Sequence, residues 1–246
     1  MGPNRFSRDE IVLALGGPEL SLSGEVGLLG STPWPRRWYA PGIMGWFSFV
    51  PFMQCYHGIV SLDHGLEGEL CLNGTHVDLS GGRGYTEKDW GSAFPSVWVW
   101  FHSNHFDTAH TSLTASVATI PWLGSEFAGF IIGLWHDSRL YRFATYTGAR
   151  LEALRVDEDS IDWVIADKRL RLRVQITRDR AGQLYAPDIA DMSGRVGETL
   201  GASATVTLAA RCLTGADDTV IFSERAWLGA LEVVGDWTRL AAGARS

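Results

Sequence analysis

Hydrophobic and polar residues alternate with a period of two along most of the chain. The segment LRLRVQIT (residues 170–177) places Leu, Leu, Val and Ile on one face and Arg, Arg, Gln and Thr on the other. This pattern is typical of a strand with one buried and one solvated face. The segments GELCLNGTHVDLSGG, SATVTLAAR and TVIFSE repeat it. The sequence therefore predicts an all-β fold of antiparallel strands.

Turn residues separate the expected strands at two places. Asn73 and Gly74 stand between two alternating runs, and both residues tolerate positive φ, so they predict a two-residue hairpin. Asp167 and Lys168 separate IDWVIA from LRLRVQI and predict a second hairpin. Helical candidates are few, and the best of them, residues 149–154, is short.

The region Arg178–Gly201 has the weakest strand pattern. Its glycines, Pro187 and charged residues predict a long connection between strands. We expect residues 1–246 to form one β domain, with residues 178–201 as the position of an internal boundary if there is one.

Composition narrows the possible functions. The chain has 46% hydrophobic and 20% charged residues, which is typical of a folded globular protein. Its formal net charge of −7 argues against nucleic acid as a partner, because phosphate binding requires a basic face. The eleven tryptophans are the unusual feature. Each supplies a large apolar surface suited to a core, a ligand pocket or a membrane interface.

Other features predict a cytoplasmic location. The three cysteines have the spacing of neither a disulfide framework nor a zinc site, which favours buried thiols in a reducing compartment. The N-terminus has no signal-peptide or transit-peptide pattern. The longest apolar run, IMGWFSFVPFM, is too short to cross a bilayer. Its WFSFVPF portion near Trp46 predicts either a buried strand, the favoured interpretation, or a loop in peripheral contact with a membrane.

The stretch GGRGYTEKDWGSAFPSVWVWFHSNHF (residues 81–106) carries the strongest chemical signal. In an extended chain Tyr85, Glu87 and Asp89 share one face. On a solvated face this arrangement has little meaning. If the face meets a tryptophan-rich interior, burial raises the pKa of a carboxyl group and holds it protonated as a general acid. The predicted catalytic residues are Asp89, then Glu87, with Tyr85 beside them.

Aromatic residues follow these carboxylates. Trp98 and Trp100 share a face that His102 and Asn104 continue, while Trp90 stands at the turn before them. One interpretation is a stripe of core aromatics that ends in hydrogen-bonded polar residues. The other is the wall of a substrate pocket, whose π faces stabilise a developing carbocation. The second interpretation makes all five residues substrate-binding candidates.

A third group of polar residues lies in QCYHGIVSLDHGLEG. His57 and His64 are seven positions apart and face opposite sides of a strand, which argues against a metal site. No GxSxG motif is present, which argues against a serine nucleophile. Asp63 and His64 either hold the turn by hydrogen bonds, or a histidine orients a substrate hydroxyl. His57 and Asp63 are therefore added to the substrate-binding candidates.

Several of these segments also resemble a known family. IMGWFSFVPFMQCYHGIVSLDHGLEGEL, GGRGYTEKDWGSAFPSVWVWFHSNHF, LYAPDIADMSGRVGETL and GALEVVGDW resemble, in this order, the tocopherol cyclase family. The resemblance extends from about Asn4 to Trp237, and its most specific part is the run YxEKDWGxxFPxxWxW. It implies an antiparallel, lipocalin-like β-barrel or sandwich related to the carotenoid 1,2-hydratases.

The same resemblance implies a function. It predicts an isomerase that forms the chromanol ring of vitamin E from a prenylated quinol and needs no cofactor. The alternatives are a hydratase of isoprenoid double bonds and a non-catalytic carrier of hydrophobic ligands. In each case the partner is a hydrophobic small molecule. Family members usually carry a further N-terminal segment with a FEGWY-like strand, so we expect a first β-subdomain that is incomplete. The composition resembles that of bacterial members.

Overall fold

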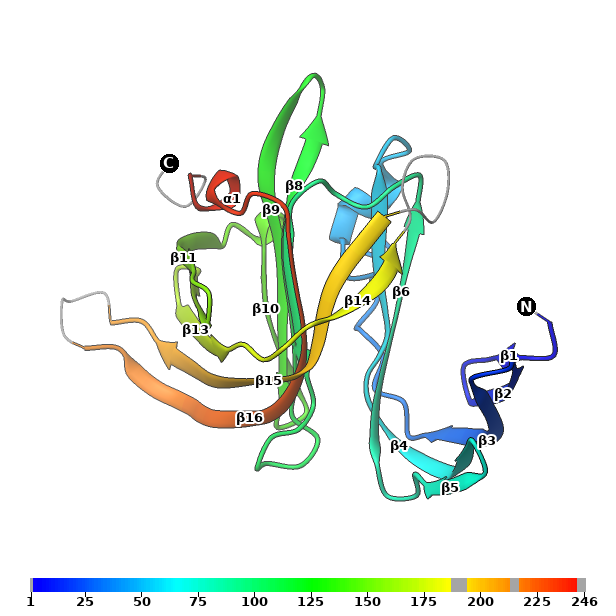
Figure 1. The fold of residues 1–246 in the computed structure, drawn as a ribbon. Coiled ribbons are helices and arrows are strands. Elements are labelled where there is room, and N and C mark those ends of the chain that lie inside the picture. The colour runs from blue at the N-terminus through cyan, green and yellow to red at the C-terminus, as the bar shows by residue number, and fades with distance from the viewer. Residues whose placement is uncertain (1, 187–193, 213–216, 243–246) are drawn as a thin grey trace. The chain divides into compact units, whose positions relative to one another are not determined.

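The computed structural model describes residues 2–186, 194–212 and 217–242 (Figure 1). Almost all regular structure in them is antiparallel β, which confirms the predicted fold class. The chain forms two compact units: unit 1 is Met1–Pro35 with Ile59–Lys88, and unit 2 is Arg36–Gly58 with Asp89–Ser246. The expectation of a single β domain, with residues 178–201 as a possible internal boundary, stays a prediction. Residues 187–193 of that region lie outside the described residues.

The first sheet lies mainly in unit 1. Its strand order is β1-β2-β3-β4-β5, and β6 also pairs with β4. Strands β4 and β6 are long enough that each begins or ends in unit 2. The strands of this sheet are β1 (Arg5–Phe6), β2 (Glu10–Gly16), β3 (Ser21–Leu29), β4 (Cys55–Leu72), β5 (Thr75–Asp78) and β6 (Arg83–Gly91).

The second sheet forms most of unit 2. Its order is β10-β9-β8-β7-β16-β15-β13-β12-β11, and β14 pairs with β15. The path is not closed into a barrel, because β10 and β11 are its two ends. Its strands are β7 (Trp98–Ser103), β8 (Ser112–Trp122), β9 (Ser125–His136), β10 (Arg139–Ala144), β11 (Arg150–Val156), β12 (Ser160–Ala166), β13 (Leu170–Thr177), β14 (Gly182–Ala186), β15 (Gly194–Ala210) and β16 (Thr219–Val234).

Both predicted hairpins are present. Leu72 pairs with Thr75, and the two residues between them have φ values of 49° and 82°, as a two-residue turn requires. Strands β12 and β13 form the second hairpin, in which the Asp167 amide donates to the Leu170 carbonyl. The Asp167 carboxylate also accepts hydrogen bonds from two backbone amides of this turn, which fixes its conformation.

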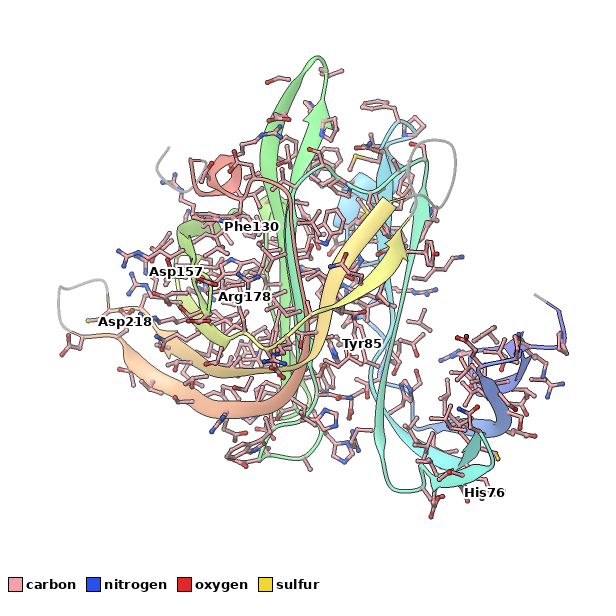
Figure 2. The ribbon with its side chains drawn as sticks, in the orientation of Figure 1. His76, Tyr85, Phe130, Asp157, Arg178 and Asp218 are labelled. Atoms are coloured by element: carbon pink, nitrogen blue, oxygen red, sulfur yellow. The ribbon has the colours of Figure 1, made fainter. Side chains whose placement is uncertain are left out.

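One apolar cluster fills unit 2. Strands from both ends of the sheet path contribute to it, so the sheet must curl around a shared core. Phe101 and Trp163 are fully buried there, and Phe130 is labelled in Figure 2. In β13, Leu172, Val174 and Ile176 are buried, as the alternating pattern predicts.

The helices of unit 2 are short. They are η1 (Gly45–Phe49), η2 (Thr145–Thr147) and α1 (Thr238–Ala242). Helix α1 packs against β8, β9 and β11, and its Leu240 is fully buried in the core. Among the described residues, none of these helices has the length and apolarity that crossing a membrane requires.

Strands β15 and β16 bend along their length, as Figure 1 shows. Their register shifts between Thr199 and Ala202, again before Ala204, and once more after Leu208. Such bulges increase the local twist and allow a long strand pair to follow a curved sheet. Gly229 permits the close approach of β16 to β7, because a Cβ at this position would lie 2.5 Å from Cε2 of Phe101.

Three local predictions were wrong. The segment WFSFVPF is not the favoured buried strand: it forms most of the helix η1 and the turn that follows, and its Trp46, Phe49 and Phe52 are exposed. Residues 149–154, the best helical candidate, lie mainly in β11, where Leu151 and Leu154 are buried. A register irregularity between Leu151 and Ala153 puts two apolar residues three positions apart, which imitates a helical period. The region 178–201 is not one long connection, because β14 pairs with β15 in a register that sets Gly182 opposite Glu198. Tertiary pairing outweighs the weak strand propensity of this glycine-rich segment.

Candidate active site

Strand β6 holds the three residues predicted to be catalytic. It is extended from Arg83 to Gly91, so alternation places Tyr85, Glu87 and Asp89 on one face, as expected. In unit 1 the Tyr85 hydroxyl donates a hydrogen bond to Oε2 of Glu87 (Tyr85 is labelled in Figure 2). Both side chains are half-buried. The pair is therefore a phenol and a carboxylate held together at a partly dry position.

Asp89, in unit 2, pairs with a histidine of the neighbouring strand β4. Its Oδ1 lies 2.5 Å from Nδ1 of His57, and the two side chains are 27% and 16% exposed. Oδ1 of Asp89 accepts a hydrogen bond from Nδ1 of His57 when the imidazole carries its proton on that nitrogen. The His57 backbone amide in turn lies 3.1 Å from the sulfur of Met44. A candidate acid and an imidazole thus share one short hydrogen bond.

Trp90 stacks on Tyr56. Their ring centroids are 5.5 Å apart and their planes differ by 8°. The Tyr56 hydroxyl donates to the Val50 carbonyl at 2.5 Å, which anchors the stack. Tyr56 and Trp90 directly adjoin His57 and Asp89 in sequence, so alternation places the aromatic stack on the other face of the two strands. Within unit 2 the Trp90 ring therefore does not cover the side chain of Asp89.

The aromatic stripe of β7 lies on the face opposite the core. Val99 and Phe101 point into the core and are fully buried. Trp98 and Trp100 therefore project to the other side of the sheet, where both are partly buried. The expected common face of these tryptophans is present, but they are not core residues, in contrast to the first of the two interpretations.

His102 continues this stripe and is almost fully buried. Its ring lies 6.4 Å from that of Trp100, and its Nε2 is 3.4 Å from the Ser112 hydroxyl. Burial lowers the pKa of His102 to about 3, and the charge of His105 adds to this effect. The imidazole is therefore neutral near pH 7 and acts as a hydrogen-bonding group without charge. Asn104, also buried, follows directly after β7.

Asp63 and His64 lie in unit 1 and are buried. Nε of Arg83 donates to Oδ1 of Asp63 at 2.9 Å, and Nη2 forms an ion pair with Oδ2. Nδ1 of His64 lies 3.1 Å from the Ser61 hydroxyl, and burial lowers the pKa of His64. Gly84 accommodates the ring, since a Cβ there would lie 2.2 Å from Nε2 of His64. Of the two roles considered, these contacts match hydrogen bonding that holds the strands.

A model of the family described as tocopherol cyclase-like matches residues 31–235. The chain belongs to this family. It is 29% identical over 109 residues to the "Probable tocopherol cyclase, chloroplastic" of Oryza sativa subsp. japonica and to the chloroplast tocopherol cyclase of Zea mays. Each match covers 42% of this chain and 23% of the plant protein.

A solved structure is also similar to this tocopherol cyclase-like chain. It is the crystal structure of a protein described as AttH from Nitrosomonas europaea. The TM-score is 0.45 and the sequence identity 14%, over 93% of this chain and 66% of that one.

The tocopherol cyclase-like chain holds two further carboxyl groups that the sequence did not reveal. Glu198 of β15 pairs in register with Glu232 of β16, and Glu232 pairs with Trp100 of β7, so all three share a face. Nε1 of Trp98 donates to Oε2 of Glu232 at 2.7 Å. Burial raises the pKa of Glu198. Nε1 of Trp100 is buried and has no hydrogen-bond partner among the described residues.

The signal for this second group is weak in the sequence. Glu198 lies in the segment interpreted as a connection, and Glu232 is 134 positions away from Trp98. Only the order β15-β16-β7 brings them together. In unit 2, Glu198 and Glu232 thus lie on the same face as Trp98 and Trp100, and neither of these carboxyl groups belongs to β6.

Proposed function

We propose that this tocopherol cyclase-like chain is an isomerase that closes a chromanol ring on a prenylated quinol. The reaction adds a proton to the less substituted carbon of a trisubstituted alkene and generates a tertiary cation. The quinol oxygen attacks the cation and then returns its proton to the carboxylate that supplied the first one, so the acid is regenerated and the product has the mass of the substrate. No electrons are gained or lost, and the proposal therefore requires no redox cofactor.

The observation that carries this proposal is the hydrogen bond between His57 and Asp89. When Nδ1 of His57 donates to Oδ1 of Asp89, Oδ2 remains as the oxygen that holds the acidic proton. After that proton has moved to the alkene, the same hydrogen bond stabilises the carboxylate. Asp89 then acts as the general acid, and His57 is a positioning residue that holds its carboxyl group in place.

Other residues support the later steps. The faces of Trp98 and Trp100 are suited to stabilising a tertiary cation. His102 is neutral and buried, so it can hydrogen-bond a quinol hydroxyl without introducing a charge. Glu198, whose pKa is raised by burial, is the alternative proton donor. Trp90 and Asn104 remain substrate-binding candidates. Asp63 has no part in this proposal, because Arg83 binds both of its carboxylate oxygens and its side chain is 1% exposed.

The decisive experiment incubates the protein with a prenylated benzoquinol and analyses the product by mass spectrometry. A cyclised product of unchanged mass supports the proposal, whereas a product heavier by one water indicates a hydratase. Binding of the quinol without any product indicates a carrier. Either of the last two results overturns the proposal.

Substitutions assign the acid. Asp89→Asn preserves size and one hydrogen bond, so quinol binding should persist while turnover falls by about 10²–10⁴-fold. A loss below about tenfold excludes Asp89 as the donor. Glu87→Gln and Glu198→Gln, measured in parallel, show which carboxyl replaces it in that case. Asp162→Asn is the matched control, because Asp162 is also a partly exposed carboxylate and pairs with Arg173.

His57→Gln tests the positioning role. Without the imidazole, the carboxylate that forms when Asp89 gives up its proton loses its hydrogen bond, so kcat should fall while KM for the quinol stays unchanged. A structural role alone would change both constants.

A further inference from the structure

Unit 2 exposes a tight turn with two aromatic residues at its tip. The amide of Arg37 donates to the carbonyl of Ala40, and the amide of Ala40 donates back to the carbonyl of Arg37. Trp38 and Tyr39 occupy the tip, with their rings edge to face at 5.4 Å. Trp38 is 89% exposed, the highest value among the large hydrophobic residues that the structure describes.

Two arginines precede this tip. Arg36 and Arg37 are exposed, and neither side chain has a hydrogen bond or ion pair in the described part of the chain. The whole chain is acidic, with a formal net charge of −7. Two unpaired cations beside the most exposed tryptophan therefore form a local exception to the overall charge. Tryptophan and tyrosine beside arginine are the residues enriched where proteins meet the headgroup region of a bilayer.

The chain that follows continues this apolar exposure. Phe49 and Phe52 are 61% and 59% exposed, although the run that contains them favours a buried strand in the sequence. Phe52 packs against Trp122 at the end of β8, with ring centroids 5.5 Å apart. The adjacent Leu123 is 81% exposed and has a φ of 47°, a conformation that bulky residues rarely adopt. Leu123 and Gly124 form the turn between Trp122 and Ser125, so Leu123 exposes its side chain at the end of this hairpin.

We propose that the exposed side chains of the segment Arg36–Phe52, above all Arg36, Arg37, Trp38 and Tyr39, dock on the surface of a bilayer that contains anionic phospholipid. Trp38 and Tyr39 insert at the level of the headgroups, and the arginines bind lipid phosphates or carboxylates. This inference goes beyond the proposed function and does not depend on it, since it concerns a surface rather than a reaction.

The test uses sedimentation of the full chain with vesicles of phosphatidylcholine alone and of phosphatidylcholine mixed with phosphatidylserine. We expect stronger binding to the mixed vesicles than to phosphatidylcholine alone, and weaker binding to the mixed vesicles at high salt. Arg36→Gln together with Arg37→Gln should weaken it about 25-fold, about fivefold for each arginine. Trp38→Ala together with Tyr39→Ala should weaken it about tenfold or more on both vesicle types.

Trp227→Ala is the matched control. Trp227 is 50% exposed and also lies beside an arginine, Arg225, but it is outside the segment. Its replacement should leave vesicle binding unchanged. Circular dichroism of each variant checks that the fold is intact.

A conservative variant covers the case in which the alanine variants do not fold. With brominated lipid in the vesicles, tryptophan fluorescence of the native chain should be quenched, and Trp38→Phe should lose a share of that quenching.

The proposal is wrong if the chain binds no vesicles, if binding is equal on both vesicle types, or if Trp38 and Trp227 variants behave alike. Concentration-dependent self-association that is lost in the Trp38 variants would instead identify the surface as a contact between copies. Turnover of a detergent-dispersed quinol, measured on the same variants, remains a separate test of the reaction.

Discussion

Unit 2 buries the apolar faces of its strands in one cluster that extends from Val97 to Leu240, whereas unit 1 buries only a few apolar side chains. In unit 1 the buried set includes polar residues with defined partners, above all Asp63 and His64. Large apolar residues of its strands, such as Phe6 and Leu72, remain exposed. The difference indicates that unit 2 is stabilised by the burial of apolar surface, while unit 1 depends more on specific polar contacts.

The largest expected effect is in the core of unit 2. Phe101→Ala removes a fully buried ring below β16 and leaves a cavity, so the free energy of unfolding should fall by about 3–5 kcal/mol. Phe6→Ala in unit 1 removes a ring that is 59% exposed and should change stability by less than about 0.5 kcal/mol. Urea unfolding followed by circular dichroism measures both. Similar losses in the two variants would contradict the contrast between the units.

A polar substitution should have the next largest effect, and in unit 1. Asp63→Asn breaks the ion pair with Arg83, where the Asp63 side chain is 1% exposed and burial already lowers the pKa of Arg83. The guanidinium keeps its desolvation cost without its counter-charge, so the free energy of unfolding should fall by about 2–4 kcal/mol.

Hydrogen exchange of the β3 and β4 amides is the suitable measurement for Asp63→Asn, because it reports the local stability of the strands that the ion pair joins. Asp162→Asn serves as the control in unit 2, since its pair with Arg173 is largely solvated and is worth less than about 1 kcal/mol. If protection in β3 and β4 is unchanged in Asp63→Asn, the ion pair does not stabilise unit 1.

The sequence predicts the regular parts of this fold and misses the irregular ones. The alternating pattern identifies β13, because Leu172, Val174 and Ile176 stand at every second position and are all buried on one face of the strand. It misses β11, where an irregularity interrupts the period, and β14, whose pairing with β15 depends on strand order rather than composition. A periodic pattern reports burial, so it is informative only where the register is uninterrupted.

The candidate site is predictable to a similar extent. Alternation correctly places Tyr85, Glu87 and Asp89 on one face of β6, because this requires only an extended chain. The pairing of Asp89 with His57 depends on β4 and β6 being neighbours. The meeting of Glu232 with Trp98 depends on β16 joining β7 across more than half the sequence. Contacts of this kind follow from topology, which local patterns do not determine.

A further effect, which is absent at pH 7, should appear when the pH is lowered. Burial holds His102 of unit 2 neutral, with a pKa of about 3 against 6.5 for the free side chain. Between these values only the unfolded chain binds the proton, so stability is constant above pH 6.5 and falls on acidification. In this range the titration of His102 alone changes the free energy of unfolding by about 1.4 kcal/mol per pH unit. His102→Gln should be less stable at pH 7 but should lose this slope, as urea unfolding at several pH values can show. An unchanged slope would mean that other groups cause it.

The smallest effect compares the two carboxyl groups that share a face of unit 2. Burial raises the pKa of Glu198, so its charged form is disfavoured, and stability that is present below about pH 4.5 is lost as the pH rises and the group ionises. Glu198→Gln removes that cost and should leave stability at pH 7 unchanged or raise it by up to about 1 kcal/mol. Glu232→Gln weakens the hydrogen bond from Trp98 and should lower stability by about 1 kcal/mol. The opposite signs distinguish a carboxyl group whose charged form is disfavoured by burial from one that accepts a hydrogen bond from a donor.

In unit 1 the pKa of the solvated Glu25 is raised instead by its neighbour Glu10. The change in stability caused by Glu25→Gln should therefore depend on salt concentration, whereas the change caused by Glu198→Gln should not. If Glu198→Gln is clearly destabilising at pH 7, its carboxylate has a favourable partner, and it is then no candidate for a proton donor.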